Sequence, residues 1–210
     1  RLWNIIFYKK MKTICIIGNS SLGAYFRYYS VFKQKKFKFI IISSKKIKNK
    51  IPSSVKFFYV SNKDNDKFNM ESYKILKKFN PEKIILFYTK KINKIIYSNF
   101  KTINIHNSFL PNYRGLNAMK RSYKDQVKLV ISSSHFVNEK FDSGKIIHQI
   151  VTPVKKNNLK YFEKTSFFHR VILLEAAINS KSKNHFSIIN NETIISPGLD
   201  LKKIDYKFWK

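Results

Sequence analysis

Apolar residues in this sequence gather in short runs, separated by polar segments rich in Lys, Asn and Ser. Several of these runs have the length and the polar boundaries that are typical of buried β-strands. In the first half of the chain, the predicted strands are residues 12–18, 37–43, 55–60, 83–88 and 102–106.

Between these strands, apolar residues recur at helical spacing. Ser20 or Ser21 would cap the first helix, and Pro81 suits the end of the second. The predicted helices of this half are residues 21–32, 70–79 and 91–100. Because strands and helices alternate, the sequence predicts an α/β domain with a largely parallel sheet.

The second half departs from this alternation. Two strand-like runs, residues 128–137 and 145–154, flank a turn-like segment so closely that we expect an antiparallel pair. Helices are predicted at residues 116–126 and 159–180, and the tail after residue 190 is expected to add one edge strand. The predicted fold class is therefore α/β, with a mostly parallel sheet flanked by helices and an antiparallel C-terminal part.

The predicted strands and helices belong to one domain. Met11 opens the first strand, so we interpret residues 1–10 as an extension and a candidate for disorder, 11–185 as the domain and 186–210 as a C-terminal tail. There is no run of about 18 apolar residues, so no membrane span is expected. The apolar part of the first ten residues is too short for a signal peptide, and a cytoplasmic location is the default expectation.

Composition narrows the chemistry further. Cys15 is the only cysteine, which excludes an intrachain disulfide and a cysteine-rich metal site, and its place in a strand predicts an inert core thiol. The net charge of +30 suggests nucleic-acid binding, but only five of the 42 basic residues are Arg, and the lysines are spread along the whole chain. A basic nucleic-acid binder therefore remains a distant alternative.

Candidate chemistry lies where the last strand of the first half ends. Side chains alternate along a strand, so Asn104 and His106 share one face, where an amide and an imidazole could hold an oxyanion and move a proton. Taken alone, the pair is more often a capping Asn and a hydrogen-bonded loop His. A third residue, Asp142, lies in an acidic turn before Gly144, and a carboxylate beside an imidazole raises its basicity and orients it.

Two segments carry a resemblance to a known family. The stretches "NIHNSFLPNYRG" and "HFVNEKFDSGKIIHQ", and the interval between Asn104 and Asp142, resemble the folate-dependent formyltransferases. The match is dense from about residue 83 to 154. The resemblance implies a Rossmann-like formyltransferase fold and a one-carbon transferase that uses 10-formyltetrahydrofolate and needs no metal.

The resemblance also implies roles for individual residues. Asn104 and protonated His106 would stabilise a tetrahedral oxyanion, and Asp142 would orient His106 and shuttle the proton lost by the attacking amine. A cis peptide bond is expected at Leu110–Pro111.

Binding residues follow from the same resemblance. The pterin would be held mainly by backbone groups in two segments, whose residues are Tyr88, Thr89, Lys90, Lys91, Ile92, Asn138, Glu139, Lys140 and Phe141. The acceptor would lie near Gly18, Asn19, Ser20, Ser21, Arg114, Gly115 and His135, although a structural role for His135 is an equal alternative. We interpret His148, His169 and His185 as structural or solvated.

The acceptor amine is less well defined by the sequence. Glycinamide ribonucleotide, in purine biosynthesis, is the leading candidate, and "GNSSLG" offers an anion cradle but departs from the "GNGSNL" type of loop that grips its phosphate. Amino sugars on nucleotide carriers and amino acids are alternative acceptors. Members that formylate methionyl-tRNA carry a further barrel domain for which 210 residues leave no room, so that acceptor is not expected. A hydrolase that releases formate from 10-formyltetrahydrofolate is a more distant reading.

Overall fold

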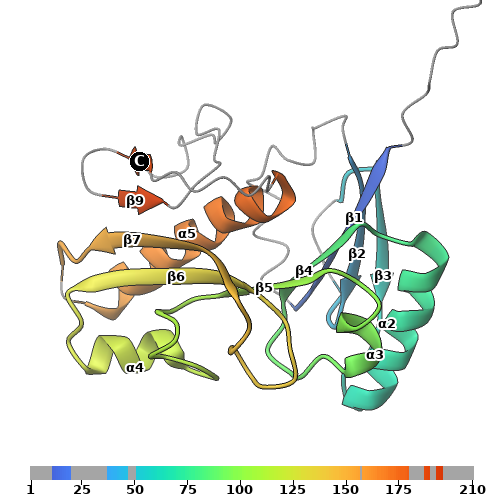
Figure 1. The fold of residues 1–210 in the computed structure, drawn as a ribbon, viewed down its shortest axis with the longest axis horizontal. Helices are drawn as coiled ribbons and strands as arrows, with labels where there is room; N and C mark the ends of the chain where they lie inside the picture. Colours follow the sequence, from blue (N-terminus) through green and yellow to red (C-terminus); the bar gives the residue numbers. More distant parts are fainter. Residues whose placement is uncertain are drawn as a thin grey trace, which may run out of the picture.

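The computed structural model describes residues 11–19, 37–46, 51–156, 158–179, 187–189 and 193–195. Three strands come first among the described elements, helices and strands then alternate, and two pairs of consecutive strands lie nearer the end of the chain (Figure 1). In chain order the elements are β1 (Lys12–Gly18), β2 (Phe37–Ser43), β3 (Val55–Tyr59), α2 (Asn65–Phe79), β4 (Lys83–Phe87), α3 (Lys94–Tyr97), β5 (Thr102–His106), α4 (Ala118–Lys124), β6 (Leu129–Phe136), β7 (Ile146–Pro153), α5 (Leu159–Asn179), β8 (Ser187–Ile189) and β9 (Thr193–Ile195).

The described strands form a single sheet in the order β3-β2-β1-β4-β5-β6-β7-β9-β8. Neighbours from β3 to β5 pair in parallel, and every pair from β5 to β8 is antiparallel. The predicted α/β class, a largely parallel sheet with an antiparallel C-terminal part, is confirmed.

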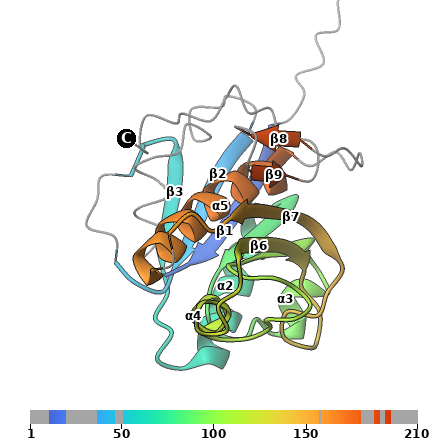
Figure 2. The same cartoon turned by 90° about the vertical axis from the view of Figure 1, so that its left-hand side faces the viewer.

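Two apolar layers cover the parallel strands. Ile14 and Ile16 of β1 face α5, whereas Cys15 and Ile17 face α2 and α3 on the other side of the sheet (Figures 1 and 2). Both faces of β1 are therefore buried, which explains why its sequence is an unbroken apolar run rather than an alternating one. Cys15 is fully buried, as expected of a core thiol, and burial raises the pKa of this thiol.

A buried lysine ties α5 to the sheet. Lys83 opens β4, and its ammonium group donates to the carbonyl oxygens of Ala177 (3.2 Å) and Ile178 (3.1 Å) at the C-terminus of α5. These carbonyls belong to the last turn of α5, and a cation is favoured at this end of the helix dipole. Burial lowers the pKa of Lys83, so the position stabilises the helix end at some cost in desolvation.

The helices differ from the sequence prediction mainly in where they begin and end. The first predicted helix, residues 21–32, lies outside the described residues. The second begins five residues earlier than predicted, at Asn65, where the Asp64 carboxylate caps the backbone N–H groups of Asp66 and Lys67. Only residues 94–97 of the third form a helix, whereas α4 and α5 lie within the predicted ranges.

The segment that we interpreted as a tail contributes to the same sheet. β9 pairs with β7, and β8 pairs with β9 and forms the edge. One edge strand was expected after residue 190; β9 lies there but is paired on both sides, and the edge is formed by β8. Among the described residues, no helix combines the length and the apolar character that a membrane crossing requires.

Candidate functional site

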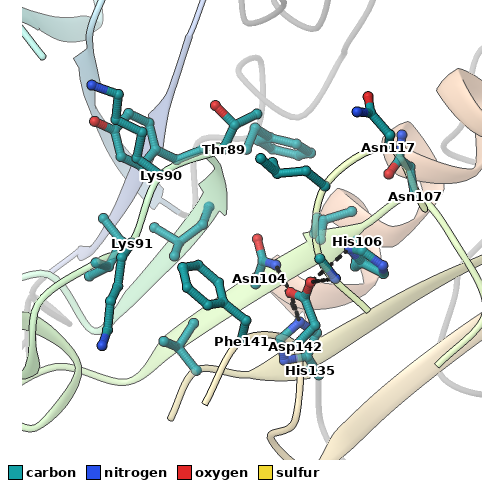
Figure 3. A pocket seen from close by; sticks show the side chains of 18 of the residues that line it. Thr89, Lys90, Lys91, Asn104, His106, Asn107, Asn117, His135, Phe141 and Asp142 are labelled. Carbon is teal, nitrogen blue, oxygen red and sulfur yellow. Dashed lines mark hydrogen bonds and ion pairs between the residues drawn. The ribbon is translucent and has the colours of Figure 1, made fainter. Parts of the chain in front are cut away.

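A cavity of about 530 Å³ opens where β1, β4 and β5 end. Its walls come from Asn19 after β1, from the segment after β4, from the end of β5 and from the loop between β6 and β7 (Figure 3). Ligands of open α/β sheets bind at the carboxyl ends of the parallel strands, so the cavity has the position expected of a binding site.

Most of the residues proposed from the sequence line this cavity. They are Asn19, Tyr88, Thr89, Lys90, Lys91, Ile92, Asn104, His106, Gly115, His135, Asn138, Glu139, Lys140, Phe141 and Asp142. Gly18 is the last residue of β1 and Arg114 precedes Gly115, but within the described part of the chain neither is among the lining residues. Ser20 and Ser21 lie outside the described residues.

The pairing of β5 with β6 brings the first polar side chains together. Asn104 lies opposite His135, and His106 lies opposite Ser133, in an antiparallel register. Directly opposed residues project to the same face of a sheet. The expectation that Asn104 and His106 share a face is confirmed, and the same face receives His135.

The turn between β6 and β7 carries Asp142 to this face. Asp142 has a left-handed backbone conformation, with φ of 46°. Two residues later, Gly144 packs so closely that an added Cβ would lie 1.7 Å from the carbonyl oxygen of Phe136. A glycine is therefore required where the turn crosses the end of β6, and this close crossing directs Asp142 back toward β5.

Four groups surround the Asp142 carboxylate (Figure 3). Its Oδ1 accepts from the amide nitrogen of Asn104 at 3.0 Å and lies 3.3 Å from His135 Nε2. Its Oδ2 accepts from the backbone N–H of Gly115 at 2.8 Å and lies 3.4 Å from His106 Nδ1. The residues predicted to form a triad are thus in direct contact.

These contacts keep the carboxylate ionised. Burial alone would raise the pKa of Asp142, but the hydrogen bond from His135, the charge of His106 and the Gly115 N–H together lower it to about 2. Asp142 is therefore negatively charged at any pH near neutrality. It can accept a proton only from a strongly acidic group, such as one that forms transiently during a reaction.

His106 has an oxygen acceptor at each ring nitrogen. Nε2 lies 2.6 Å from the carbonyl oxygen of Tyr113, and Nδ1 faces Asp142. Burial lowers the pKa of His106 below its ordinary value, although the Asp142 charge and the Tyr113 hydrogen bond both act to raise it. The two acceptors favour the doubly protonated imidazolium, and burial opposes it, so the ring is placed to take up and release a proton.

His135 contributes a second buried imidazole. Its Nδ1 donates to the carbonyl oxygen of Phe136 at 2.9 Å, and its Nε2 lies 3.3 Å from Asp142 Oδ1. That nitrogen lies 3.2 Å from the amide nitrogen of Asn104. His135 therefore helps to orient Asn104, a contact that fits both the structural and the substrate-binding interpretations given above.

The amide of Asn104 is oriented by these contacts. Its nitrogen points to Asp142 and His135, and its oxygen points away from Asp142 (Figure 3). The donor that was expected to hold an oxyanion is thus engaged with the carboxylate in this arrangement. A negative oxygen in the cavity would have to compete with Asp142 for it.

Further residues line the cavity that the sequence had not identified individually. Asn107, Leu116, Asn117, Met119 and Lys120 come from the segment after β5 and the start of α4, and Arg170 comes from α5. Leu116 and Asn117 directly follow Arg114 and Gly115, which had been proposed to lie near the acceptor. Arg170 had no local signal, because its approach to the cavity depends on how α5 packs.

The loop after β5 has the predicted backbone. The Leu110–Pro111 peptide bond is cis, as the resemblance implied. Among the described residues, no group of three or more His, Cys, Asp or Glu side chains is placed to hold a metal ion. The arrangement instead offers an ionised carboxylate, an imidazole and an amide on one wall, which together can accept a proton and donate hydrogen bonds to a negative oxygen.

Comparison with known proteins agrees with this chemistry. A model of the formyl transferase family matches residues 28–171. Formyltetrahydrofolate deformylase 2 of Arabidopsis thaliana, a mitochondrial protein, is 40% identical over 76 residues, which cover 35% of this chain and 23% of that protein. The formyltetrahydrofolate deformylase of Bacillus subtilis is 32% identical over 96 residues, 45% of this chain and 32% of that protein. The matches thus span only about a quarter to a third of these curated relatives.

Solved structures share the fold. Glycinamide ribonucleotide transformylase 1 from Symbiobacterium toebii superposes with a TM-score of 0.71 at 19% identity, covering 92% of this chain and 98% of that one. A formyltetrahydrofolate deformylase from Pseudomonas syringae pv. tomato has a TM-score of 0.66 at 20% identity, covering 89% of this chain and 66% of that one. At such low sequence identities, structural similarity establishes the fold alone. The reaction has to be inferred from the residues of the site.

Proposed function

Because the chain belongs to the formyl transferase family, we propose that it transfers the formyl group of 10-formyltetrahydrofolate to a primary amine of a small acceptor. The observation that carries the proposal is the contact of the Asp142 carboxylate with both Asn104 and His106 on the wall of the cavity. A solvated histidine and a capping asparagine would have no reason to converge on one buried carboxylate.

The reaction needs a group that stabilises developing negative charge. Attack of the amine nitrogen on the formyl carbon forms a C–N bond and moves an electron pair onto the formyl oxygen. The positive charge of protonated His106 would stabilise that oxygen, and the amide of Asn104 would donate to it, in a site where burial strengthens such interactions. Expulsion of the folate nitrogen then breaks the original C–N bond and leaves a formamide and tetrahydrofolate.

Asp142 would manage the proton of the nucleophile. The attached ammonium nitrogen of the tetrahedral species is far more acidic than the free amine, so even a carboxylate with a pKa of about 2 can relay its proton to the departing nitrogen through water. As that proton approaches Asp142, the carboxylate becomes a weaker acceptor for the hydrogen bond from the Asn104 amide. The amide is then freed to donate to the oxyanion at the moment when it is needed.

The two substrates would occupy different parts of the cavity. The folate ring would rest on the segments 88–92 and 138–141, and the acceptor would lie toward Asn19, Asn117 and Lys120. Lysine and asparagine side chains among the lining residues suit a phosphorylated acceptor, which supports glycinamide ribonucleotide as the leading candidate. Sugar nucleotides and amino acids remain alternative acceptors.

The curated relatives favour a second candidate. The relatives from Arabidopsis thaliana and Bacillus subtilis are named as deformylases of formyltetrahydrofolate, and their matches exceed 30% identity over the aligned segments. In that reaction water would replace the amine as nucleophile, and the same three residues would serve it. The two candidates differ only in what the acceptor end of the cavity admits.

A product assay distinguishes them. The protein is offered 10-formyltetrahydrofolate alone, and then with glycinamide ribonucleotide, an aminodeoxy-sugar nucleotide or free amino acids, while formate and the formylated amine are both measured. Formylation of one acceptor, with little formate in its absence, is the expected result. Formate released at full rate without any amine would establish the hydrolase instead.

The variant His106→Ala tests whether His106 acts in the reaction or in folate binding. We expect this variant to lose transfer while it binds the folate almost as well as the parent protein, because backbone groups are expected to hold the pterin. Calorimetry with a non-reactive folate measures the binding. Loss of binding in the variant would contradict the assignment of His106 to chemistry rather than to folate recognition.

A further inference from the structure

The segment 107–117, which joins β5 to α4, supplies two backbone groups to the site. The carbonyl oxygen of Tyr113 accepts from His106 Nε2 at 2.6 Å, and the N–H of Gly115 donates to Asp142 Oδ2 at 2.8 Å. Both members of the His106–Asp142 pair are therefore oriented by main chain of one loop. The positions of these backbone groups depend on what holds the loop.

Gln149, on β7, is hydrogen-bonded to this loop. Its amide nitrogen donates to the carbonyl oxygen of Leu110 at 3.0 Å and to Ser133 Oγ at 3.1 Å. The Ser133 hydroxyl donates in turn to the carbonyl oxygen of Ser108 at 3.0 Å. Two side chains from β7 and β6 thus fix two carbonyls of the loop, and the N–H of Tyr113 continues the link by donating to the carbonyl oxygen of Phe109 at 2.7 Å.

Asp125 holds the loop from its other side. The hydroxyl of Tyr113 donates to Asp125 Oδ2 at 2.8 Å, at the C-cap of α4. This hydrogen bond raises the pKa of the Tyr113 hydroxyl, as expected when a neutral donor faces a carboxylate. The guanidinium of Arg121, also on α4, donates to the carbonyl oxygen of Arg114. Tyr113 is thereby fixed at its side chain while its carbonyl faces His106.

We propose that Gln149 and Asp125, which are not among the described residues lining the cavity, are positioning residues that hold the Tyr113 carbonyl against His106. They act through the loop and touch no reacting atom. For the rate of formyl transfer this inference rests on the proposed function, whereas the state of the His106 ring can be measured without any substrate.

The physical consequence concerns the proton on His106. While the Tyr113 carbonyl accepts from Nε2, the neutral ring carries its proton there, and a second proton on Nδ1 can be shared with Asp142. If the carbonyl moves away, the single proton is better placed on Nδ1, where the carboxylate accepts it. The ring then loses one of the two acceptors that favour the imidazolium, so both its tautomer and its proton affinity change.

The first test replaces Gln149 by leucine and follows His106 by 15N NMR. We expect the neutral tautomer to shift from Nε2–H toward Nδ1–H and the titration midpoint of His106 to fall. The matched control is His148→Leu, the preceding residue on β7, which faces the opposite side of the sheet and contacts Ser134. That variant is expected to lose stability but to leave the His106 tautomer unchanged.

Asp125 allows a second test of the inference. Because its side chain is exposed, its substitution should not prevent folding. Asp125→Ala removes the acceptor of the Tyr113 hydroxyl, whereas Asp125→Asn keeps an oxygen acceptor and removes only the charge. We expect the tautomer to shift in the alanine variant and to be restored in the asparagine variant. Lys124→Ala, at the adjacent exposed position, controls for disturbance of the helix end and is expected to resemble the parent protein.

The rate measurement completes the test. If transfer occurs, kcat should fall roughly 10- to 100-fold in Gln149→Leu, the range expected for a slightly misplaced catalytic group, with KM for the folate within about threefold of the parent value. Unchanged His106 tautomer and titration in both Gln149→Leu and Asp125→Ala would overturn the inference. Because that outcome needs no substrate, it is distinguishable from a failure of the proposed reaction.

Discussion

Gly144 shows at the scale of a single residue how packing creates the site. The residue has no Cβ to collide with the end of β6, and this lets the turn that carries Asp142 cross directly over Phe136. Gly115, on the opposite side of Asp142, differs in that a Cβ would meet nothing within 4 Å, although its φ of 78° disfavours other residues. The two glycines thus separate a steric requirement from a conformational one.

Gly144→Ala is therefore expected to be the more damaging of the two substitutions. The new methyl group would overlap a backbone oxygen, so the turn must move and carry Asp142 away from His106. We expect a loss of about 2–4 kcal/mol in the free energy of unfolding, together with loss of activity. Gly115→Ala should cost only about 1–2 kcal/mol, the penalty of a left-handed conformation. Chemical denaturation of both variants makes the comparison, and equal losses would contradict the steric explanation.

At the scale of secondary structure, the buried strands were predicted best. β1 and β2 have the predicted bounds, because strands that are covered on both faces must be continuously apolar. The first turn of α2 was missed, since residues 65–69 are mostly polar and give little helical periodicity. The sequence nevertheless contained a signal for the start of this helix, because Asp is a favoured N-cap residue and Asp64 directly precedes α2.

Asp64 also gives a prediction for this element. Its carboxylate accepts from the N–H groups of Asp66 at 2.9 Å and Lys67 at 3.1 Å, which otherwise have no partner within the helix. Asp64→Ala should lower the free energy of unfolding by about 1 kcal/mol. Lys74→Ala, exposed in the middle of the same helix, should change it by less than about 0.5 kcal/mol. If urea unfolding gives equal values for the two variants, the cap does not stabilise α2.

The site was predictable from sequence only where its residues follow local rules. Alternation along a strand placed Asn104 and His106 on one face, and motif spacing identified Asp142 as their partner. The supporting contacts could not be predicted, because Gln149 and Asp125 reach the loop through the pairing of β6 with β7 and through the end of α4. Those contacts depend on tertiary packing, which no short stretch of sequence records.

At the scale of the whole molecule, the sheet separates the cavity from a second set of buried histidines. His148, Ile150 and Thr152 are two residues apart along β7, so their side chains share one face of the sheet. Ile150 packs with residues of α5, so this face is turned toward α5 and away from Gln149. His169 of α5 lies 2.8 Å from Thr152 Oγ1, and His148 Nδ1 lies 3.1 Å from Ser134 Oγ. Neither imidazole has an anionic partner among these contacts, so both are expected to serve the core rather than the reaction.

These histidines make the fold sensitive to acid. Burial lowers the pKa of His148 to about 4 and that of His169 to about 3, whereas both titrate near pH 6.5 in the unfolded chain. From about pH 6.5 downward, the unfolded state therefore binds more protons than the folded state. The stabilisation is complete above pH 6.5, and the free energy of unfolding falls by about 1.4 kcal/mol per pH unit for each histidine as the pH decreases through this window.

His169→Gln tests this account because it removes one titrating group and keeps a polar side chain beside Thr152. Urea unfolding of the variant should show a pH dependence between pH 6.5 and 5 that is shallower by about one proton, or about 1.4 kcal/mol per pH unit. Thr152→Val removes the hydrogen-bond partner but leaves the imidazole, so it should lower stability at every pH and keep the slope. A slope that is unchanged in His169→Gln would show that His169 is not held neutral in the folded core, and the acid sensitivity would then come from His148 and the carboxylates.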